Sequence, residues 1–210
     1  MKDSFKEKGY KVIKQVVNIE LCTFIHDYFL LKRQVAKTFF ETRYISPYTE
    51  EYGVFGDGQC PNSYAHYSDV AMEILLVWLK PLMEKEIKED LYPTYSYARI
   101  YDKGNVLEKH KDRFSCEIST TLNLGGDLWP IFLEDKKGKQ IKISLNKGDM
   151  LIYKGNELFH WREPLEKDYC VQVFLHYNKI STDKNKKNFL DTRPHLGLPV
   201  YFKKNKNDPR

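Results

Sequence analysis

The stretch TYSYARIYDKGNVLEKHKDRFSCEISTTLNL, residues 94–124, decides the fold class that we predict for this chain. Its two ends are rich in β-branched and aromatic residues, and the glycine and asparagine between them are typical of turns that join short strands. Five more β-rich runs follow at near-regular intervals: WPIFLE (129–134), KQIKISL (139–145), GDMLIYKG (148–155), LFHWRE (158–163) and DYCVQVFLHY (168–177). Seven or eight short strands without intervening helices predict a mainly β fold with added helices, built as a sandwich, barrel or jelly roll.

The residues before this β region predict a strand and two helices. Residues 10–17 alternate apolar and polar side chains as a strand does, and Asn18 is a good N-cap for the amphipathic run behind it. Ser68 is the N-cap that we expect for a second helix, which Pro81 either kinks or splits in two. The apolar stripe expected on this helix consists of Val70, Ile74, Leu75, Trp78, Leu82 and Met83. We expect the helices to cover one face of the β core, and residues 44–67, which show no steady period, to form a lid or binding loop.

Length and composition favour a single globular unit. The chain has 210 residues, of which 41% are hydrophobic and 14% aromatic, so it can form a substantial core. We expect one domain, 1–210, with an N-terminal part (1–94), a jelly-roll core (95–178) and a basic C-terminal tail (179–210). No run approaches the roughly 20 apolar residues of a membrane span, and no apolar segment follows the basic start as in a secretory signal. We therefore expect a cytoplasmic protein that does not associate with membranes.

Cysteine spacing and charge distribution exclude two further classes. The four cysteines lie far apart and form no C-x-x-C pair, which argues against a zinc knuckle and a dithiol redox site. The net charge of +5 comes largely from residues 179–187 and 202–210. The sequence has no helix-turn-helix or RNP-like pattern, so we do not expect a nucleic-acid partner.

Two histidines and one aspartate could hold a metal ion together. His110 and Asp112 lie two residues apart at the end of the first β segment, so on an extended backbone their side chains point to the same face. His160 follows the strand GDMLIYKG, and a jelly roll could bring it beside the pair. Two imidazoles and one carboxylate form the facial triad that holds Fe(II) with three open positions. An H-x-D pair also arises by chance on surfaces, so the order of the motifs carries more weight than the pair alone.

That ordered set resembles the 2-oxoglutarate- and Fe(II)-dependent dioxygenases, specifically their prolyl-4-hydroxylase-like branch. It consists of YARIYDKGNVLEK, the H-x-D pair, an alternating strand, a Gly-Asp turn with its strand, and the second histidine; the resemblance covers residues 95–178. It implies a double-stranded β-helix, a form of jelly roll, with Fe(II) bound by His110, Asp112 and His160. It also implies 2-oxoglutarate as cosubstrate, O₂ as oxidant, and hydroxylation of a C–H bond in a peptidyl prolyl residue or a small molecule, with release of succinate and CO₂.

The resemblance also requires a cation for the C5 carboxylate of 2-oxoglutarate, because a buried carboxylate without partners is costly. The family usually has Arg or Lys eight to eleven residues after the second histidine, where this chain has Asp168, Tyr169, Cys170 and Val171. Arg162 is the replacement that we expect, since it lies two residues after His160 and points to the same face of its strand. Alternatively, Arg162 pairs with Glu163 or Glu166 at the rim. Lys167 is the second candidate for the cation.

Three more side chains are candidates for contacts with the cosubstrate. Tyr101 and Thr121 stand where the family often supplies hydroxyl groups, although an inward threonine or a tyrosine at the edge of the core would look the same in sequence. Gln172 has inward parity on the last strand if Phe174 also faces in. His176, at the end of that strand, is interpreted as a capped strand-end residue.

Two other classes of function stay open. A cupin-like jelly roll can hold a metal or a sugar without catalysis, and the missing cation on the last strand favours this alternative. A zinc hydrolase built on the same triad is disfavoured, because no glutamate or aspartate is obviously placed beside it as a base.

Overall fold

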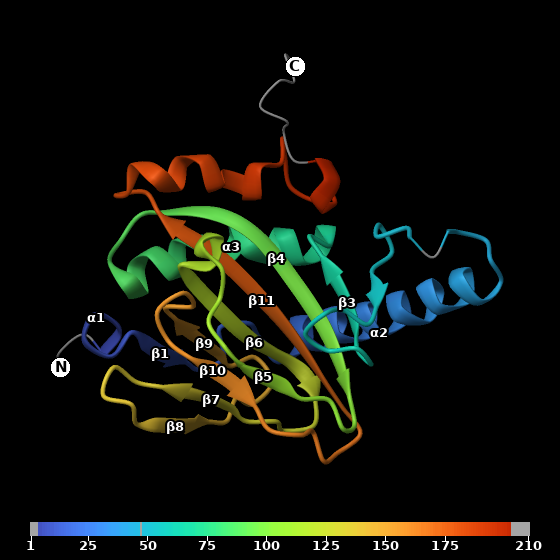
Figure 1. The fold of residues 1–210 in the computed structure, drawn as a ribbon, viewed down its shortest axis with the longest axis horizontal. Helices are drawn as coiled ribbons and strands as arrows, with labels where there is room; N and C mark the ends of the chain where they lie inside the picture. The colour runs from blue at the N-terminus through green and yellow to red at the C-terminus, as the bar shows by residue number, and fades with distance from the viewer. Residues whose placement is uncertain (1–3, 47, 203–210) are drawn as a thin grey trace.

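The computed structural model describes residues 4–46 and 48–202, and its strands form two antiparallel sheets (Figure 1). The large sheet contains, in spatial order, β1 (Tyr10–Ile13), β9 (Met150–Tyr153), β6 (Ile118–Gly126), β11 (Tyr169–Lys179), β4 (Leu91–Asp102), β3 (Tyr64–Tyr67) and β2 (Val54–Phe55). The small sheet contains β5 (Leu107–His110), β10 (His160–Arg162), β7 (Ile131–Glu134) and β8 (Gln140–Ile143).

From β4 onward the chain winds back and forth between the two sheets. The strands β4, β6, β9 and β11 belong to the large sheet, and β5, β7, β8 and β10 belong to the small one. This winding is that of a double-stranded β-helix, so the predicted mainly β fold with a jelly-roll core is confirmed. The strand β5, which carries His110, is an additional strand that the sequence did not separate from its neighbours.

Two long helices cover the face of the large sheet that points away from the small sheet (Figure 1). Buried side chains of both helices, such as Phe29 and Leu76, form one core with Leu122 and Val173 of the large sheet. This core supports the strands from behind, so the expected covering of one face by the N-terminal helices is observed. The helices are α1 (Ser4–Lys8), α2 (Ile19–Glu41) and α3 (Val70–Ile87).

The structure confirms one predicted N-cap and corrects the other. Asn18 caps α2, because its side-chain oxygen accepts a hydrogen bond from the Leu21 amide at 2.8 Å. For α3 the cap is Asp69, not Ser68, since the Asp69 carboxylate accepts from two amides of the first turn. The Ser68 hydroxyl instead donates to the carbonyl of Leu198. Pro81 lies inside a continuous helix and does not split it.

The buried face of α3 also differs from the expected stripe. Val70, Ile74 and Trp78 are 62%, 63% and 57% exposed. The helix buries a row shifted around its axis, which includes Met72, Leu75, Leu76, Leu79, Met83 and Ile87. Both rows have helical spacing, so periodicity alone could not say which of them faces the sheet.

Residues 44–67 do not form a loop throughout. Their second half forms the short hairpin of β2 and β3, which extends the large sheet beside β4. Asp57, between the two strands, forms an ion pair with Arg99 of β4 and accepts a hydrogen bond from the Tyr97 hydroxyl at 2.6 Å. The tip of the hairpin is thereby fixed to the inner side of β4.

The C-terminal region lies along the body from Asp183 to Phe202 and is not a solvated tail there (Figure 1). The Arg193 guanidinium is fully buried and donates to Glu73 of α3 at 2.9 Å and to the carbonyl of Thr94 at 3.0 Å. Two short 3₁₀ segments, η2 (Asp183–Thr192) and η3 (Val200–Phe202), flank this contact.

Three consecutive residues just before Arg193 have left-handed backbone conformations. Leu190, Asp191 and Thr192 have φ values of 50°, 52° and 69°, which non-glycine residues rarely adopt. This turn carries the Asp191 carboxylate to the Tyr67 hydroxyl, 2.7 Å away, and to the Arg113 guanidinium, 2.8 Å away. The C-terminal segment therefore contacts the loop that follows β5.

None of the helices in the described part of the chain combines the length and the apolar character that crossing a membrane requires.

Candidate metal centre

His110, Asp112 and His160 lie together between the two sheets. Their ligand atoms are all within 4.8 Å of one another. The Nε2 atoms of His110 and His160 are 3.6 Å and 3.4 Å from Asp112 Oδ1, and the two ring centroids are 4.3 Å apart. The pairing of β5 with β10 causes this convergence, because it places His160 directly opposite His110.

Backbone carbonyls orient both imidazole rings. His110 Nδ1 lies 2.7 Å from the carbonyl oxygen of Glu108, and His160 Nδ1 lies 3.1 Å from that of Leu158. A carbonyl can only accept, so each Nδ1 carries a proton, and each Nε2 faces Asp112 and could bind a metal ion once it has lost its own proton. The edge of the Tyr153 ring also packs on His160, with 4.8 Å between centroids.

The Asp112 carboxylate presents one oxygen to the histidines, and its other oxygen accepts a hydrogen bond. Asp112 Oδ2 accepts a hydrogen bond from the Ser119 hydroxyl at 2.6 Å, and the Asp112 amide donates to the Gly155 carbonyl at 2.9 Å. Gly155 fits tightly, since a Cβ atom there would overlap Asp112 Oδ2. The arrangement favours a monodentate ligand through Oδ1.

The charges of the cluster are coupled. Burial opposes ionisation of Asp112, but hydrogen bonds from His110 and His160 hold its pKa well below the usual range. Burial lowers the pKa of His110, yet the hydrogen bonds to Asp112 and to the Glu108 carbonyl raise it overall. The group is therefore an ionised carboxylate with two imidazoles around it, which suits a divalent cation.

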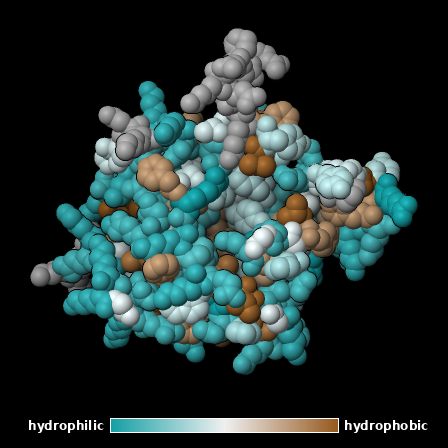
Figure 2. All heavy atoms as spheres, viewed as in Figure 1, coloured by the Kyte–Doolittle hydropathy of each residue, from teal (hydrophilic) through white to brown (hydrophobic). Residues whose placement is uncertain are grey.

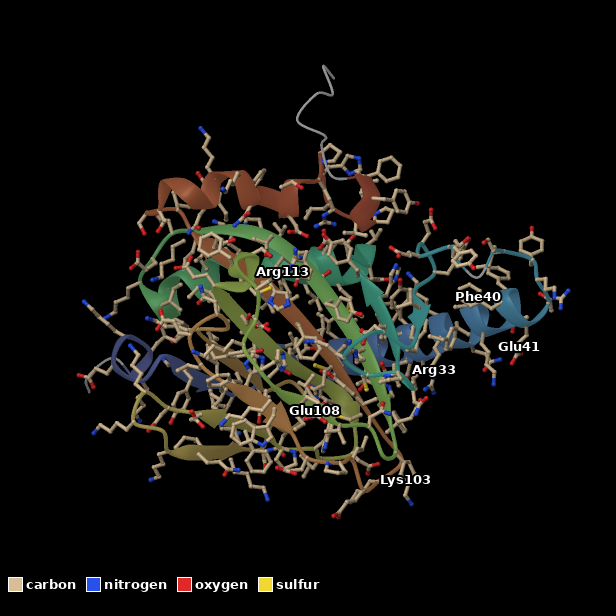
Figure 3. All side chains as sticks on the ribbon, viewed as in Figure 1. Arg33, Phe40, Glu41, Lys103, Glu108 and Arg113 are labelled. Carbon is tan, nitrogen blue, oxygen red and sulfur yellow. The ribbon has the colours of Figure 1, made fainter. Side chains whose placement is uncertain are left out.

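A cavity of about 340 Å³ opens beside this cluster. Figure 2 shows the surface hollowed near the middle of this face. In Figure 3, Glu108 and Arg113 bracket the segment that carries His110 and Asp112, and Arg113 lies toward the C-terminal segment. The cavity wall includes Tyr95, Tyr97, Arg99, Tyr101, Tyr153, Phe174 and His176.

Arg162 lies deeper in the β-helix than the metal-ligating group. It is 1% exposed, its Nη1 donates to the carbonyl of Trp129, and its Nη2 lies 3.3 Å from Thr121 Oγ1. The Thr121 hydroxyl donates to Gln172 Oε1 at 2.9 Å. Three of the predicted cosubstrate residues, Arg162, Thr121 and Gln172, are thus in one hydrogen-bonded cluster that joins both sheets.

This cluster has unused hydrogen-bonding capacity. The Nε of Arg162 and the hydroxyl of Tyr101 are buried without a hydrogen-bond partner, and no carboxylate of the described residues pairs with Arg162. A buried guanidinium without a counterion is costly unless an anion joins it. These residues therefore fit the carboxylate end of a small dicarboxylate such as 2-oxoglutarate.

The other positions considered for the cation lie elsewhere or lack a charge. Lys167 is exposed and lines a separate hollow with Glu163 and Glu166, so it is not brought to the cavity. Cys170 is close enough to Arg162 for the guanidinium to favour its thiolate, although burial raises the pKa of this thiol overall.

Sequence reasoning missed the part of the cavity wall formed by Tyr95, Cys116 and His176, and Ser119, which contacts His176. His176 is 6% exposed, its Nδ1 lies 3.0 Å from Ser119 Oγ, and its ring centroid lies 4.6 Å from that of Tyr95. It is not a simple strand-end residue, because the rest of the site encloses it. The two-residue period of the last strand could have identified it, because His176 has the same inward parity as Gln172 and Phe174.

Solved structures similar to this one include 2-oxoglutarate- and Fe(II)-dependent oxygenases. A prolyl-4-hydroxylase from Pseudomonas putida has a TM-score of 0.60 and 13% identity, with 84% of this chain and 96% of that chain covered. HygX from Streptomyces hygroscopicus, with nickel and 2-oxoglutarate bound, has a TM-score of 0.60 and 12% identity over 84% and 85%. A Trichoplax adhaerens prolyl hydroxylase in complex with a hypoxia inducible factor peptide has a TM-score of 0.63 and 13% identity over 88% and 87%.

No protein-family model matches the sequence, and no curated protein sequence matches it significantly. Identities of this size show a common fold. The chain thus has the double-stranded β-helix of the 2-oxoglutarate- and Fe(II)-dependent oxygenases, prolyl-4-hydroxylases included, and it carries a His-Asp-His group.

Proposed function

We propose that this chain is a 2-oxoglutarate- and Fe(II)-dependent dioxygenase, an oxidoreductase that hydroxylates a C–H bond of a peptidyl prolyl residue or of a small molecule. Succinate and CO₂ would be the products of the cosubstrate. The observation that carries the proposal is the convergence of His110, Asp112 and His160 on one cavity, with the buried Arg162 two residues deeper on the same strand.

The three ligands would hold Fe(II) and leave three positions for other groups. When bound, Fe(II) would supply the redox chemistry that couples decarboxylation of 2-oxoglutarate to oxidation of a C–H bond by O₂. The chain orients the ligands for this task. Backbone carbonyls fix both imidazoles, and Ser119 holds the second oxygen of Asp112 away from the centre.

Arg162 would bind the C5 carboxylate of 2-oxoglutarate in a charge-assisted pair. It lies roughly 7 Å farther along the strand than His160, which leaves room for the carbon chain of the cosubstrate. The Tyr101 hydroxyl, which has no partner among the described residues, would donate to the same carboxylate. Thr121 and Gln172 would hold the guanidinium in place.

A second cavity gives the substrate room outside the metal-ligating group. It has a volume of about 480 Å³ and shares Asp57, Tyr95, Tyr97 and Arg113 with the first cavity. Among the similar structures, one holds a peptide and another holds hygromycin B. The experiment described next therefore includes both peptides and small molecules as substrates. A cytoplasmic location stays a prediction from the sequence.

The experiment begins without oxygen. Fe(II) and 2-oxoglutarate added to the full chain should produce the weak visible absorption of the iron chelate. Admission of air should then yield succinate, and panels of proline-containing peptides and of small metabolites should reveal which substrate class increases its release.

Two results would contradict the proposal. Absence of the chelate band at saturating Fe(II) and 2-oxoglutarate would favour the non-catalytic, cupin-like alternative, which binds a metal or sugar only. If the chelate band forms but no substrate panel raises succinate above the amount that free iron produces without protein, oxygenase turnover is excluded.

A further inference from the structure

A second group of metal-ligating side chains lies against the first. The carboxylate of Asp112, the thiol of Cys116 and the imidazole of His176 each offer a ligand atom within 4.8 Å of the other two. Cys116 ends the short 3₁₀ turn Phe114–Cys116, and His176 comes from β11. The two groups share Asp112, whose Oδ1 faces His110 and His160 while Oδ2 lies toward Ser119.

The donor set of this second group differs chemically from the first. It combines sulfur, nitrogen and oxygen, whereas the first group offers only nitrogen and oxygen. Thiolate and imidazole are preferred ligands of Zn²⁺, and carboxylate oxygen completes many of its sites. Three protein ligands would leave one position of a tetrahedral ion for water or another group. The Ser119 hydroxyl lies 3.0 Å from His176 Nδ1.

An ion can reach this group. Cys116 and His176 are 2% and 6% exposed, yet both line the 340 Å³ cavity that opens at the first group. The Cys116 Sγ atom contacts the Tyr95 hydroxyl at 3.0 Å. Arg113 packs on Tyr95, with its guanidinium carbon 4.6 Å from that ring centroid, and its charge is paired with Asp191. Asp112, Cys116 and His176 therefore all line the cavity, and the described groups in contact with their ligand atoms include the hydroxyls of Tyr95 and Ser119.

We propose that Asp112, Cys116 and His176 form a second cation site that takes Zn²⁺ next to the first centre. Binding converts the Cys116 thiol into a thiolate bound to the ion, and the thiol proton leaves to solvent. Because both sites use Asp112, occupancy of one changes the affinity of the other. The site does not depend on the proposed oxygenase activity, since its evidence is the donor set alone.

Co²⁺ is the probe that separates the two sites. A thiolate bound to Co²⁺ gives an intense charge-transfer absorption in the near ultraviolet, which a site of two imidazoles and one carboxylate lacks. Anaerobic titration of the full chain with Co²⁺ should develop this absorption and reach two ions per chain, one for each group. Added Zn²⁺ should abolish the absorption as it displaces Co²⁺.

Variants assign the absorption to its ligand. Cys116→Ser should abolish it and reduce the stoichiometry to one ion, while the matched control Cys22→Ser, at a buried thiol in the main core, should keep both. The double variant His110→Ala/His160→Ala should retain the absorption with one ion. That last result would hold even if the chain proves not to be an oxygenase.

Three outcomes would overturn the proposal. Wild-type protein that binds Co²⁺ without the thiolate absorption has no such site, and this readout needs no variant to fold. An absorption unchanged in folded Cys116→Ser belongs to another thiol. An absorption lost in folded His110→Ala/His160→Ala would mean that Cys116 serves the first centre instead of a separate one.

Discussion

At the scale of single residues, the candidate centre depends on how Asp112 is held. One oxygen faces two imidazoles and the other accepts from Ser119, while Gly155 lies where any Cβ atom would overlap the carboxylate. Partners of a ligand that fix its orientation commonly change metal affinity by one to two orders of magnitude when they are lost. A glycine in the wall can therefore matter as much as a ligand.

Gly155→Ala should weaken metal binding roughly tenfold to a hundredfold, because the new methyl group would overlap the Asp112 carboxylate, the Ser119 hydroxyl that holds it and the Cys116 carbonyl, and so displace the carboxylate. Isothermal titration with Ni²⁺ would measure the affinity. Gly58→Ala is the matched control, since a Cβ there meets no atom within 4 Å. Equal affinity of Gly155→Ala and wild type would show that the carboxylate is not held as described.

Arg162→Ala should weaken 2-oxoglutarate binding by roughly a hundredfold or more, because two charge-assisted hydrogen bonds contribute about 1.5–3 kcal/mol each. Binding of the metal alone should stay nearly the same, since Arg162 contacts none of the three ligands. The chelate absorption as a function of 2-oxoglutarate concentration measures the affinity for the cosubstrate, and isothermal titration with Ni²⁺ measures binding of the metal alone. Lys167→Ala, at an exposed site, is the control and should bind 2-oxoglutarate as wild type does. If Arg162→Ala also binds 2-oxoglutarate with unchanged affinity, the cation for its C5 carboxylate lies elsewhere.

At the scale of elements, the short strands of the small sheet gain support on their outer side. Trp161 of β10 stacks beside Phe132 of β7, with centroids 5.6 Å apart. The ammonium groups of Lys109 and Lys142 lie over these rings at 5.0 Å and 5.9 Å, so the row runs across all four strands. Such pairs contribute about 0.5–1 kcal/mol each at exposed sites, which helps strands of three or four residues to stay paired.

The N-terminus of α3 should make stability depend on pH. Burial opposes ionisation of Asp69, but His66 nearby and the Lys32 ammonium hold its pKa well below the usual range. A depressed pKa in the folded state stabilises the protein above about pH 4, and this contribution is lost as the pH falls toward the folded pKa.

Asp69→Asn should therefore destabilise the protein by roughly 1–3 kcal/mol at pH 7, because asparagine can still cap the helix but leaves Lys32 without its carboxylate. The difference from wild type should shrink below about pH 4. Urea unfolding at a series of pH values measures it. A difference that stays constant across the series would exclude the carboxylate charge as the cause.

At the scale of the whole molecule, the C-terminal segment ties the helices to the β-helix. Arg193 joins Glu73 of α3 to the carbonyl of Thr94 on β4, and Pro199 and Val200 line the second cavity. The segment is thus part of the wall that a substrate would meet under the proposed function.

Arg193→Met should cost about 3–5 kcal/mol, since it leaves the buried Glu73 carboxylate without its cation. Chemical denaturation measures the loss. The double variant Glu73→Gln/Arg193→Met should recover part of the stability, because the amide removes the unpaired charge and keeps an acceptor for the Ser96 amide. A loss below about 1 kcal/mol in the single variant would show that the pair contributes little.

Local patterns predicted much of this architecture. Strand periodicity predicted a mainly β fold, and the resemblance carried by the order of His110, Asp112 and His160 implied the β-helix. The two-residue period predicted that Arg162 is on the inner face. The sequence could not predict the contacts that join distant segments. Ser68 and Asp69 are both acceptable caps; in the structure Asp69 caps the helix, and the Ser68 hydroxyl donates to the carbonyl of Leu198, which is remote in sequence.

The direct opposition of His110 and His160 has a consequence for motion within the small sheet. Strands as short as β5 and β10 open locally at little cost, and an ion held by both histidines would fasten them together. Saturation with Ni²⁺ should slow amide hydrogen exchange most in these two strands, with α3 nearly unaffected. Uniform slowing along the chain would instead mean that the ion acts on global unfolding.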